Sequence, residues 1–212
     1  MPAATPNPSA RTGTAEAILN IAQALIQSRG YSAISYQDIA SALNIRKASI
    51  HHHFPTKADL GAAVVERYIQ RFEVALNAIM SAETTNSLAM LDFYFRPYRE
   101  IAATPDQICL CGALAGEMPA LPPTLRERVD YFFKSHHSWL AAILRRGSGR
   151  KEFVLVTSPE RSARLIFDAL QGALLVRRTT GETAEIEEVI AALLAQIGAC
   201  LPQSQGASTL QR

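Results

Sequence analysis

The sequence predicts an all-α protein with an N-terminal helix-turn-helix domain of three helices and a C-terminal helical domain. Apolar residues recur at steps of three and four positions through most of the 212-residue chain, as they do on one face of a helix. The alternation that is typical of a half-buried strand is nowhere sustained. In addition, segment 35–57 has the pattern of two short helices joined by a tight turn.

The first helix of this pair is expected at residues 36–43, after an amphipathic helix that ends near Arg29 and Gly30. Ser35 and Asp38 have the spacing of a capping box, in which two side chains satisfy the free N–H groups at a helix start. Asn44 stands where the chain must turn, and asparagine tolerates the left-handed backbone of a helix end. These features predict a short helix followed by a tight turn.

The second helix of the pair is expected at residues 46–53. Ile50 and Phe54 lie four positions apart and, with Ile45, can pack on the first helix. The open side then carries Arg46, Lys47, Ser49 and His51, beside the small Ala48. Pro55 ends the helix, because the residue before a proline is pushed out of the helical conformation. A basic, polar helix of this kind is typical of proteins that bind DNA.

The remainder of the chain also has helical periodicity. Apolar residues from Leu60 to Ile79 predict a long helix that leaves the helix-turn-helix segment. Further helices are expected at residues 87–103, 107–116, 122–146, 159–179 and 183–200, because prolines and glycines separate these segments.

Many positions of the N-terminal part together resemble TetR/AcrR-type transcriptional regulators. The resemblance covers residues 14–62 and is carried by Arg29-Gly30-Tyr31, Ser35, Asp38-Ile39-Ala40, Ile45, Lys47-Ala48-Ser49-Ile50, His53-Phe54, Lys57 and Leu60. The family usually has glycine in place of Asn44 and an aromatic residue in place of His51. The second departure leaves open what His51 contacts.

The resemblance implies that double-stranded operator DNA is a partner of the N-terminal domain. It places Arg46, Lys47, Ala48, Ser49 and His51 against the major groove, and His53 and Lys57 against phosphates. Residues 1–57 hold five Lys and Arg against two Asp and Glu, which fits an anionic partner. We therefore expect a disordered arm at 1–13, a DNA-binding domain at 14–57, an effector-binding and dimerisation domain at 58–201, and a flexible tail at 202–212.

The resemblance also implies a homodimer that acts as a repressor. Two C-terminal segments have wide apolar stripes, and the predicted interface consists of Phe167, Leu170, Leu174, Ile190, Leu193 and Ile197. A two-fold dimer would match two recognition helices to two operator half-sites. The alternative is that both stripes belong to the core of a single chain.

Aromatic residues of the middle helices predict a mostly apolar pocket for a small-molecule effector. Its expected lining is Tyr68, Phe72, Phe93, Tyr94, Cys109, Phe132, His136 and Trp139. The alternative for each of these residues is a place in the core, and for His136 a hydrogen bond to backbone.

Cys109 and Cys111 diverge on a helix, so a mutual disulfide is disfavoured. Cys109 is similar in position to the sensor of electrophiles or oxidants in one branch of the family, and the alternative is that both cysteines are small buried hydrophobes.

The alternative function is a helical enzyme or metal-binding protein that uses His136 and the cysteines. No nucleophile, base and orienting group can be assembled from the sequence, and adjacent histidines at 51–53 cannot converge on one ion. We therefore expect no enzyme activity, cofactor or metal.

The start of the chain lacks the pattern of a signal peptide, and no segment reaches the ~18 apolar residues of a membrane span. The expected location is the cytoplasm of a bacterium, without a membrane partner.

Overall fold

The computed structural model describes residues 8–81 and 85–198, and within these ranges it contains helices and connecting turns but no strand. The all-α prediction is therefore confirmed. The helices are α1 (Pro8–Arg29), α2 (Tyr36–Leu43), α3 (Lys47–His53), α4 (Lys57–Met80), α5 (Ser87–Ala103), α6 (Leu110–Ala115), α7 (Pro123–Gly149), α8 (Pro159–Thr180) and α9 (Glu185–Gln196), with a short 3₁₀ turn at Met118–Ala120.

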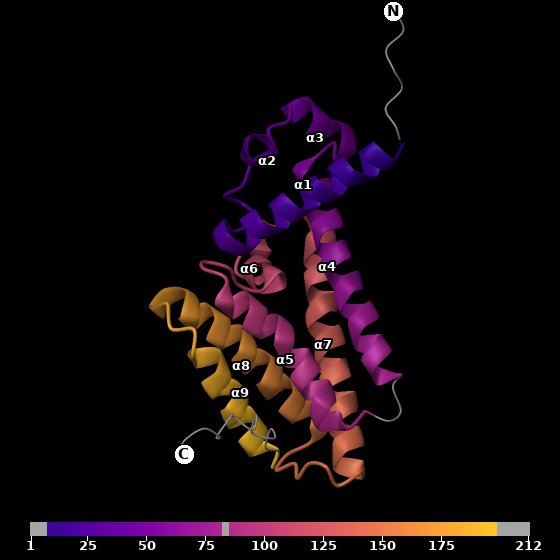
Figure 1. Cartoon of the computed structure of the whole chain (residues 1–212), viewed down its shortest axis with the longest axis vertical. Helices are drawn as coiled ribbons and strands as arrows, with labels where there is room; N and C mark the ends of the chain where they lie inside the picture. The colour runs from indigo at the N-terminus through magenta and orange to yellow at the C-terminus, as the bar shows by residue number, and fades with distance from the viewer. Residues whose placement is uncertain (1–7, 82–84, 199–212) are drawn as a thin grey trace, which may run out of the picture.

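Helices α1 to α3 form one end of an elongated molecule, and α4 runs from that end along the length of the remaining helices (Figure 1). α4 packs on α7, and α7 packs on α8. The short α6 lies against both α1 and α7, between the helix-turn-helix and the larger helical part. One hydrophobic core extends through both parts, from Ile18 and Ile50 to Leu170 and Ile190.

The helix-turn-helix forms for the local reasons that the sequence indicates. The Ser35 N–H donates to the Asp38 carboxylate at 2.7 Å, and the Asp38 N–H donates to the Ser35 hydroxyl, which completes the capping box. Asn44 has the left-handed conformation, with φ 51° and ψ 44°. Ile50 is fully buried, so the inner face of α3 is the one predicted. A second capping box, formed by Thr56 and Asp59, begins α4.

Several predicted boundaries are corrected. α1 already begins at Pro8, so residues 8–13 are helical and not part of a disordered arm. Residues 107–109 precede α6 and are not helical, and the last described helix ends at Gln196. The remainder of the arm, residues 1–7, the tail 202–212 and Cys200 lie outside the described residues.

α7 continues through the Gly147-Ser148-Gly149 segment, where the sequence predicts a break. The reason is tertiary: a Cβ on Gly147 would lie 2.3 Å from the ring of Phe153, which folds back on the helix. Phe153 is buried at this point, so the glycine makes room for packing and does not end the helix. None of the helices in the described ranges is long and apolar enough to cross a membrane.

Candidate functional site

The outer face of α3 presents the predicted DNA-contacting residues at its N-terminal end. Arg46, Lys47 and Ala48 are exposed, and Ser49 is half-buried. Arg46 is the N-cap residue, so the basic side chains stand where the first free N–H groups of the helix lie. Both features favour an anionic partner at this end of α3.

The predicted contacts at the C-terminal end of α3 have a different setting. His51 is exposed, but its ring centroid lies 4.6 Å from that of Tyr36, and its Nδ1 lies 3.3 Å from the carbonyl oxygen of Pro55. The half-buried His53 has its ring centroid 5.5 Å from that of His52. The structure therefore places these histidines on the same short helix as Lys47, but packed against neighbouring side chains and backbone.

Lys57, at the start of α4, is partly engaged within the domain. Its ammonium donates to the carbonyl oxygen of Ser32 at 3.2 Å and lies 4.7 Å from the ring centroid of Tyr31. Burial lowers the pKa of Lys57, although the nearby carboxylates of Glu117 and Asp38 oppose this shift. A phosphate contact by Lys57 would have to be made together with this bond or in its place.

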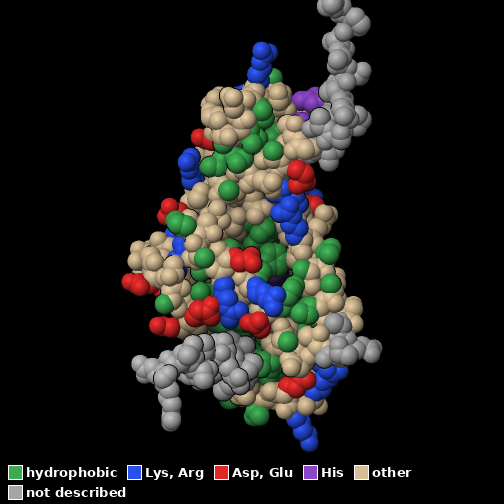
Figure 2. All heavy atoms as spheres, viewed as in Figure 1, with side chains coloured by type: hydrophobic (Ala, Val, Ile, Leu, Met, Phe, Trp, Pro, Cys, Tyr) green, Lys and Arg blue, Asp and Glu red, His purple; other side chains and the backbone are tan. Residues whose placement is uncertain are grey.

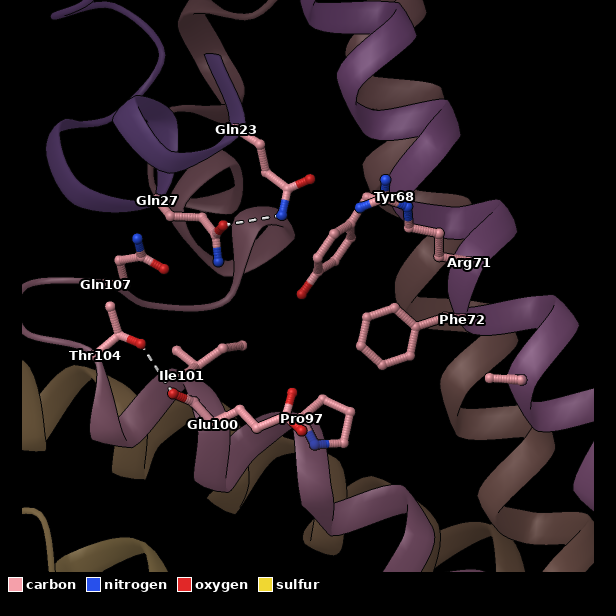
Figure 3. Close-up of a pocket in the computed structure, with 11 residues that line it drawn as sticks. Gln23, Gln27, Tyr68, Arg71, Phe72, Pro97, Glu100, Ile101, Thr104 and Gln107 are labelled. Carbon is pink, nitrogen blue, oxygen red and sulfur yellow. Dashed lines mark hydrogen bonds between the residues drawn. The ribbon is translucent and has the colours of Figure 1, made fainter. Parts of the chain in front are cut away.

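A cavity of about 360 Å³ opens between α1, α4, α5 and the loop before α6 (Figure 3). It is lined by Gln23, Gln27, Tyr68, Arg71, Phe72, Ala75, Pro97, Glu100, Ile101, Thr104 and Gln107. Only Tyr68 and Phe72 among these belong to the predicted pocket. Gln23 and Gln27 of α1 were not predicted from the sequence as lining residues. A polar residue on an amphipathic helix has the same pattern in the sequence whether it faces solvent or a cavity formed with a distant helix.

A second cavity of about 280 Å³ lies between α4 and α7. Its lining is Ile69, Phe72, Glu73, Leu76, Asn77, Tyr131, Phe132, Ser135, His136 and Trp139. Phe72 borders both cavities, so its ring is part of the wall between them. Of the predicted pocket residues, Phe93, Tyr94 and Cys109 line neither of these two cavities.

A chain of buried polar groups runs beside the cavities. The Tyr94 hydroxyl lies 2.8 Å from the Nδ1 of His136 and 3.3 Å from the hydroxyl of Tyr98, to which Gln171 donates at 3.4 Å. Burial, with a smaller effect of His137, lowers the pKa of His136 to about 3. His136 is therefore neutral near pH 7, and its partner is the Tyr94 side chain and not backbone.

Cys109 is the N-cap residue of α6 and is only 3% exposed. Its sulfur lies 3.7 Å from the hydroxyl of Tyr68, whose ring lines the first cavity. Cys111 is fully buried, and this burial raises the pKa of its thiol. Of the two thiols, Cys109 is thus the one adjacent to a cavity wall.

The six side chains predicted to form the dimer interface are buried within a single chain. Their exposed fractions are at most 6% for Phe167, Leu170, Leu174, Ile190, Leu193 and Ile197. They belong to the core of the chain, where α8 packs on α7 and α9 packs on α5 and α8, so the prediction of these residues as partner contacts is corrected. The exposed apolar side chains of α8 are instead Leu165, Leu175 and Val176, and a Cβ added at Gly172 would meet open space.

Within the described residues, no three His, Cys, Asp or Glu side chains are grouped so that they could hold a metal ion. His136 bonds Tyr94, and Cys109 contacts Tyr68, so these two candidates of the enzyme alternative do not form a pair with each other.

Comparison with known proteins gives the family. Residues 18–64 match the model of bacterial regulatory proteins of the tetR family, and residues 88–193 match the tetracyclin repressor-like C-terminal domain. A TetR-family regulator from Agrobacterium tumefaciens has a similar crystal structure, with a TM-score of 0.82 and 34% identity over 90% of this chain and 99% of that one.

Two curated relatives are regulators as well. The transcriptional regulator AcuR of Cereibacter sphaeroides is 28% identical over 149 residues, which are 69% of this chain and 68% of AcuR. The transcriptional repressor DhaR of Mycobacterium sp. is 23% identical over 170 residues, which are 78% of this chain and 83% of DhaR. The chain belongs to the TetR family, and it is a DNA-binding transcriptional regulator of the repressor type.

Proposed function

We propose that this protein is a homodimeric repressor that leaves its operator when a small organic molecule binds in the cavities beside α4. The observation that carries this proposal is the position of Phe72. Its ring borders both cavities, and it stands on the helix that begins at Lys57, directly after the recognition helix α3. A ligand that displaces Phe72 therefore acts on the helix that supports the DNA-contacting unit.

DNA recognition is assigned to the N-terminal end of α3. Arg46 and Lys47 supply exposed cations, and the small Ala48 lets the helix approach the duplex closely. Ser49 and His51 are proposed contacts to base edges in the major groove, whereas His53 and Lys57 are proposed phosphate contacts. Residues of the first kind specify sequence, and residues of the second kind contribute affinity on any duplex.

Dimerisation is assigned to the exposed faces of α8 and α9. Leu165, Leu175 and Val176 are roughly half exposed, with Gly172 between them on the same helix. Apolar side chains beside a glycine allow two helices to pack closely, and a two-fold axis through this face would join four helices. This face replaces the six buried residues that the sequence predicts.

The lining of the first cavity supports a proposal for the chemical class of the effector. Burial raises the pKa of Tyr68, so its hydroxyl remains protonated and can donate a hydrogen bond. Its only described partner is the Cys109 sulfur, which is a weak acceptor. Phe72, Pro97 and Ile101 supply apolar surface in the same cavity. This composition suits a small molecule with an apolar body and an oxygen acceptor, or an electrophile that reaches Cys109.

A mobility-shift assay on the DNA upstream of the gene for this chain tests the proposal. The full-length protein should bind that DNA as a dimer, and compounds that raise its melting temperature in a screen should release it. A helical enzyme that uses His136 and the cysteines would not bind that DNA. Absence of specific binding to that DNA, or release that is unaffected by Phe72→Ala, would contradict the proposal.

A further inference from the structure

One carboxylate from the larger helical part reaches the turn that connects α1 to α2. Glu117, which follows the C-cap residue of α6, accepts the Tyr31 N–H at 2.6 Å and the Ser32 N–H at 2.8 Å, one on each oxygen. These partners lie 86 and 85 residues away in the sequence. Hydrogen bonds to an ionised acceptor are stronger than neutral ones, and two of them fix an orientation as well as a distance.

The turn is adapted to this carboxylate. Gly30 has φ +89°, and a Cβ at Gly30 would lie 2.4 Å from Oε1 of Glu117, so only glycine admits the close approach. On the other side, Lys57 donates to the carbonyl oxygen of Ser32 and covers the ring of Tyr31. Burial raises the pKa of Glu117, but hydrogen bonds from Ser32 and Tyr31 and the charge of Lys57 outweigh it, so the pKa is lowered. The carboxylate is therefore ionised at neutral pH.

The opposite end of α6 lies at the first cavity. Gln27 lines that cavity and makes two hydrogen bonds to Ile108. Its main-chain carbonyl oxygen accepts the Ile108 N–H at 3.2 Å, and its side-chain amide donates to the Ile108 carbonyl oxygen at 2.9 Å. The next residue, Cys109, occupies the N-cap position of α6 and contacts Tyr68 through its sulfur. One short helix thus joins the cavity wall at its start to the turn before α2 at its end.

We propose that Glu117 is a positioning residue for operator recognition, which holds the turn between α1 and α2 to the end of α6 and so sets the orientation of α3 on the effector domain. The proposal rests on the function proposed above. It makes α6 a second connection between cavity and DNA-binding unit, besides α4. Glu117 itself touches no DNA and acts through the backbone of Tyr31 and Ser32.

The test compares the full-length protein with Glu117→Ala, Glu117→Gln and the control Glu127→Ala, whose glutamate is exposed on α7. Hydrogen exchange measures the exchange rates of the Tyr31 and Ser32 amides, and fluorescence anisotropy measures the affinity for two DNA duplexes. One duplex is enriched from random DNA by the unmodified protein, and the other is an unselected duplex of the same length. In Glu117→Ala we expect the two amides to exchange faster and operator affinity to fall about tenfold.

Affinity for the unselected duplex should change by less than about twofold, because the cations of α3 remain. Glu117→Gln keeps the shape of the side chain and one acceptor oxygen, so its operator affinity should fall only about threefold. If Glu117→Ala does not fold, the operator affinity of Glu117→Gln tests the proposal in its place. Equal losses on both duplexes, unchanged operator affinity, or unchanged exchange at Tyr31 and Ser32 would overturn the proposal. Failure of the unmodified protein to enrich any duplex would instead refute the proposed function, and the exchange result would still show whether Glu117 holds the turn.

Discussion

The hydroxyl of Tyr68 lies 3.7 Å from the sulfur of Cys109, with the Tyr68 ring in the wall of the first cavity and the thiol behind it. Cys109 is 3% exposed, so a reagent that enters the cavity meets the tyrosine before it meets the thiol. We therefore expect the Tyr68 ring to limit access from this cavity to Cys109, the predicted sensor.

Access to Cys109 gives the first prediction. Tyr68→Ala should increase the rate of Cys109 alkylation by N-ethylmaleimide about tenfold or more, because the ring no longer shields the sulfur. Tyr68→Phe keeps the ring and is the control, with a rate near that of the wild type. Peptide mass spectrometry of the folded protein measures both rates, and equal rates in the wild type and Tyr68→Ala would show that the ring does not control access.

The second prediction concerns the thiol as a sensor. Alkylation should lower operator affinity of the wild type, since a group attached at Cys109 enlarges the N-cap of α6. Cys109→Ser should remain bound under the same treatment, and Cys111→Ser should respond as the wild type does. Anisotropy with a labelled operator measures the release. Equal release of wild type and Cys109→Ser would eliminate the thiol model and favour a non-covalent ligand.

The third prediction concerns the face of α3 that contacts DNA. Lys47→Ala or Arg46→Ala should cost ~1–3 kcal/mol at one base position of the operator, if each contacts a base edge. Lys57→Ala should instead lower the slope of affinity against salt by about one and weaken all duplexes alike. Arg126→Ala, an exposed cation on α7, is the control and should leave both quantities unchanged. Wild-type affinity in all three variants of the DNA-binding domain would refute the assignment.

The fourth prediction separates the dimer face from the core. Leu175→Asp places a charge on a side chain that is 51% exposed, so the chain should keep its helical content and become monomeric. Leu170→Asp buries an unpaired charge at a position that is 0% exposed, and should lose the fold. Light scattering and circular dichroism distinguish the outcomes. A dimer in Leu175→Asp would move the interface to another surface.

The fifth prediction follows from the neutral state of His136. Its pKa is about 3 in the folded protein and near 6.5 when unfolded, so between these values the unfolded chain binds the extra proton. Protonation of His136 in the unfolded chain therefore does not reduce the free energy of unfolding above pH 6.5. As the pH falls below 6.5, it lowers the free energy of unfolding by up to about 1.4 kcal/mol per pH unit. Denaturant titrations should show a shallower loss between pH 6.5 and 4 in His136→Gln than in the wild type. Identical profiles would show that His136 does not contribute to the acid sensitivity.

The features that the sequence alone determined are those that depend on near neighbours in the chain. The capping box of Ser35 and Asp38, the left-handed turn at Asn44 and the buried face of α3 around Ile50 all follow from residues within a few positions of one another. For the same reason, the helix class and most boundaries of α2, α4 and α5 could be predicted, as could the family to which the helix-turn-helix belongs.

Tertiary structure alone decided which faces remain exposed and which side chains meet across the chain. The stripes of α8 and α9 have helical periodicity whether they pack on helices of the same chain or on a partner, so only the burial of Leu170 and Leu193 showed that they are core. Likewise, nothing near Glu117 in the sequence indicates a bond to Ser32, and nothing near Gln27 indicates a cavity. Such contacts depend on where distant helices are placed by the packing of the whole core, and periodicity carries no information about that placement.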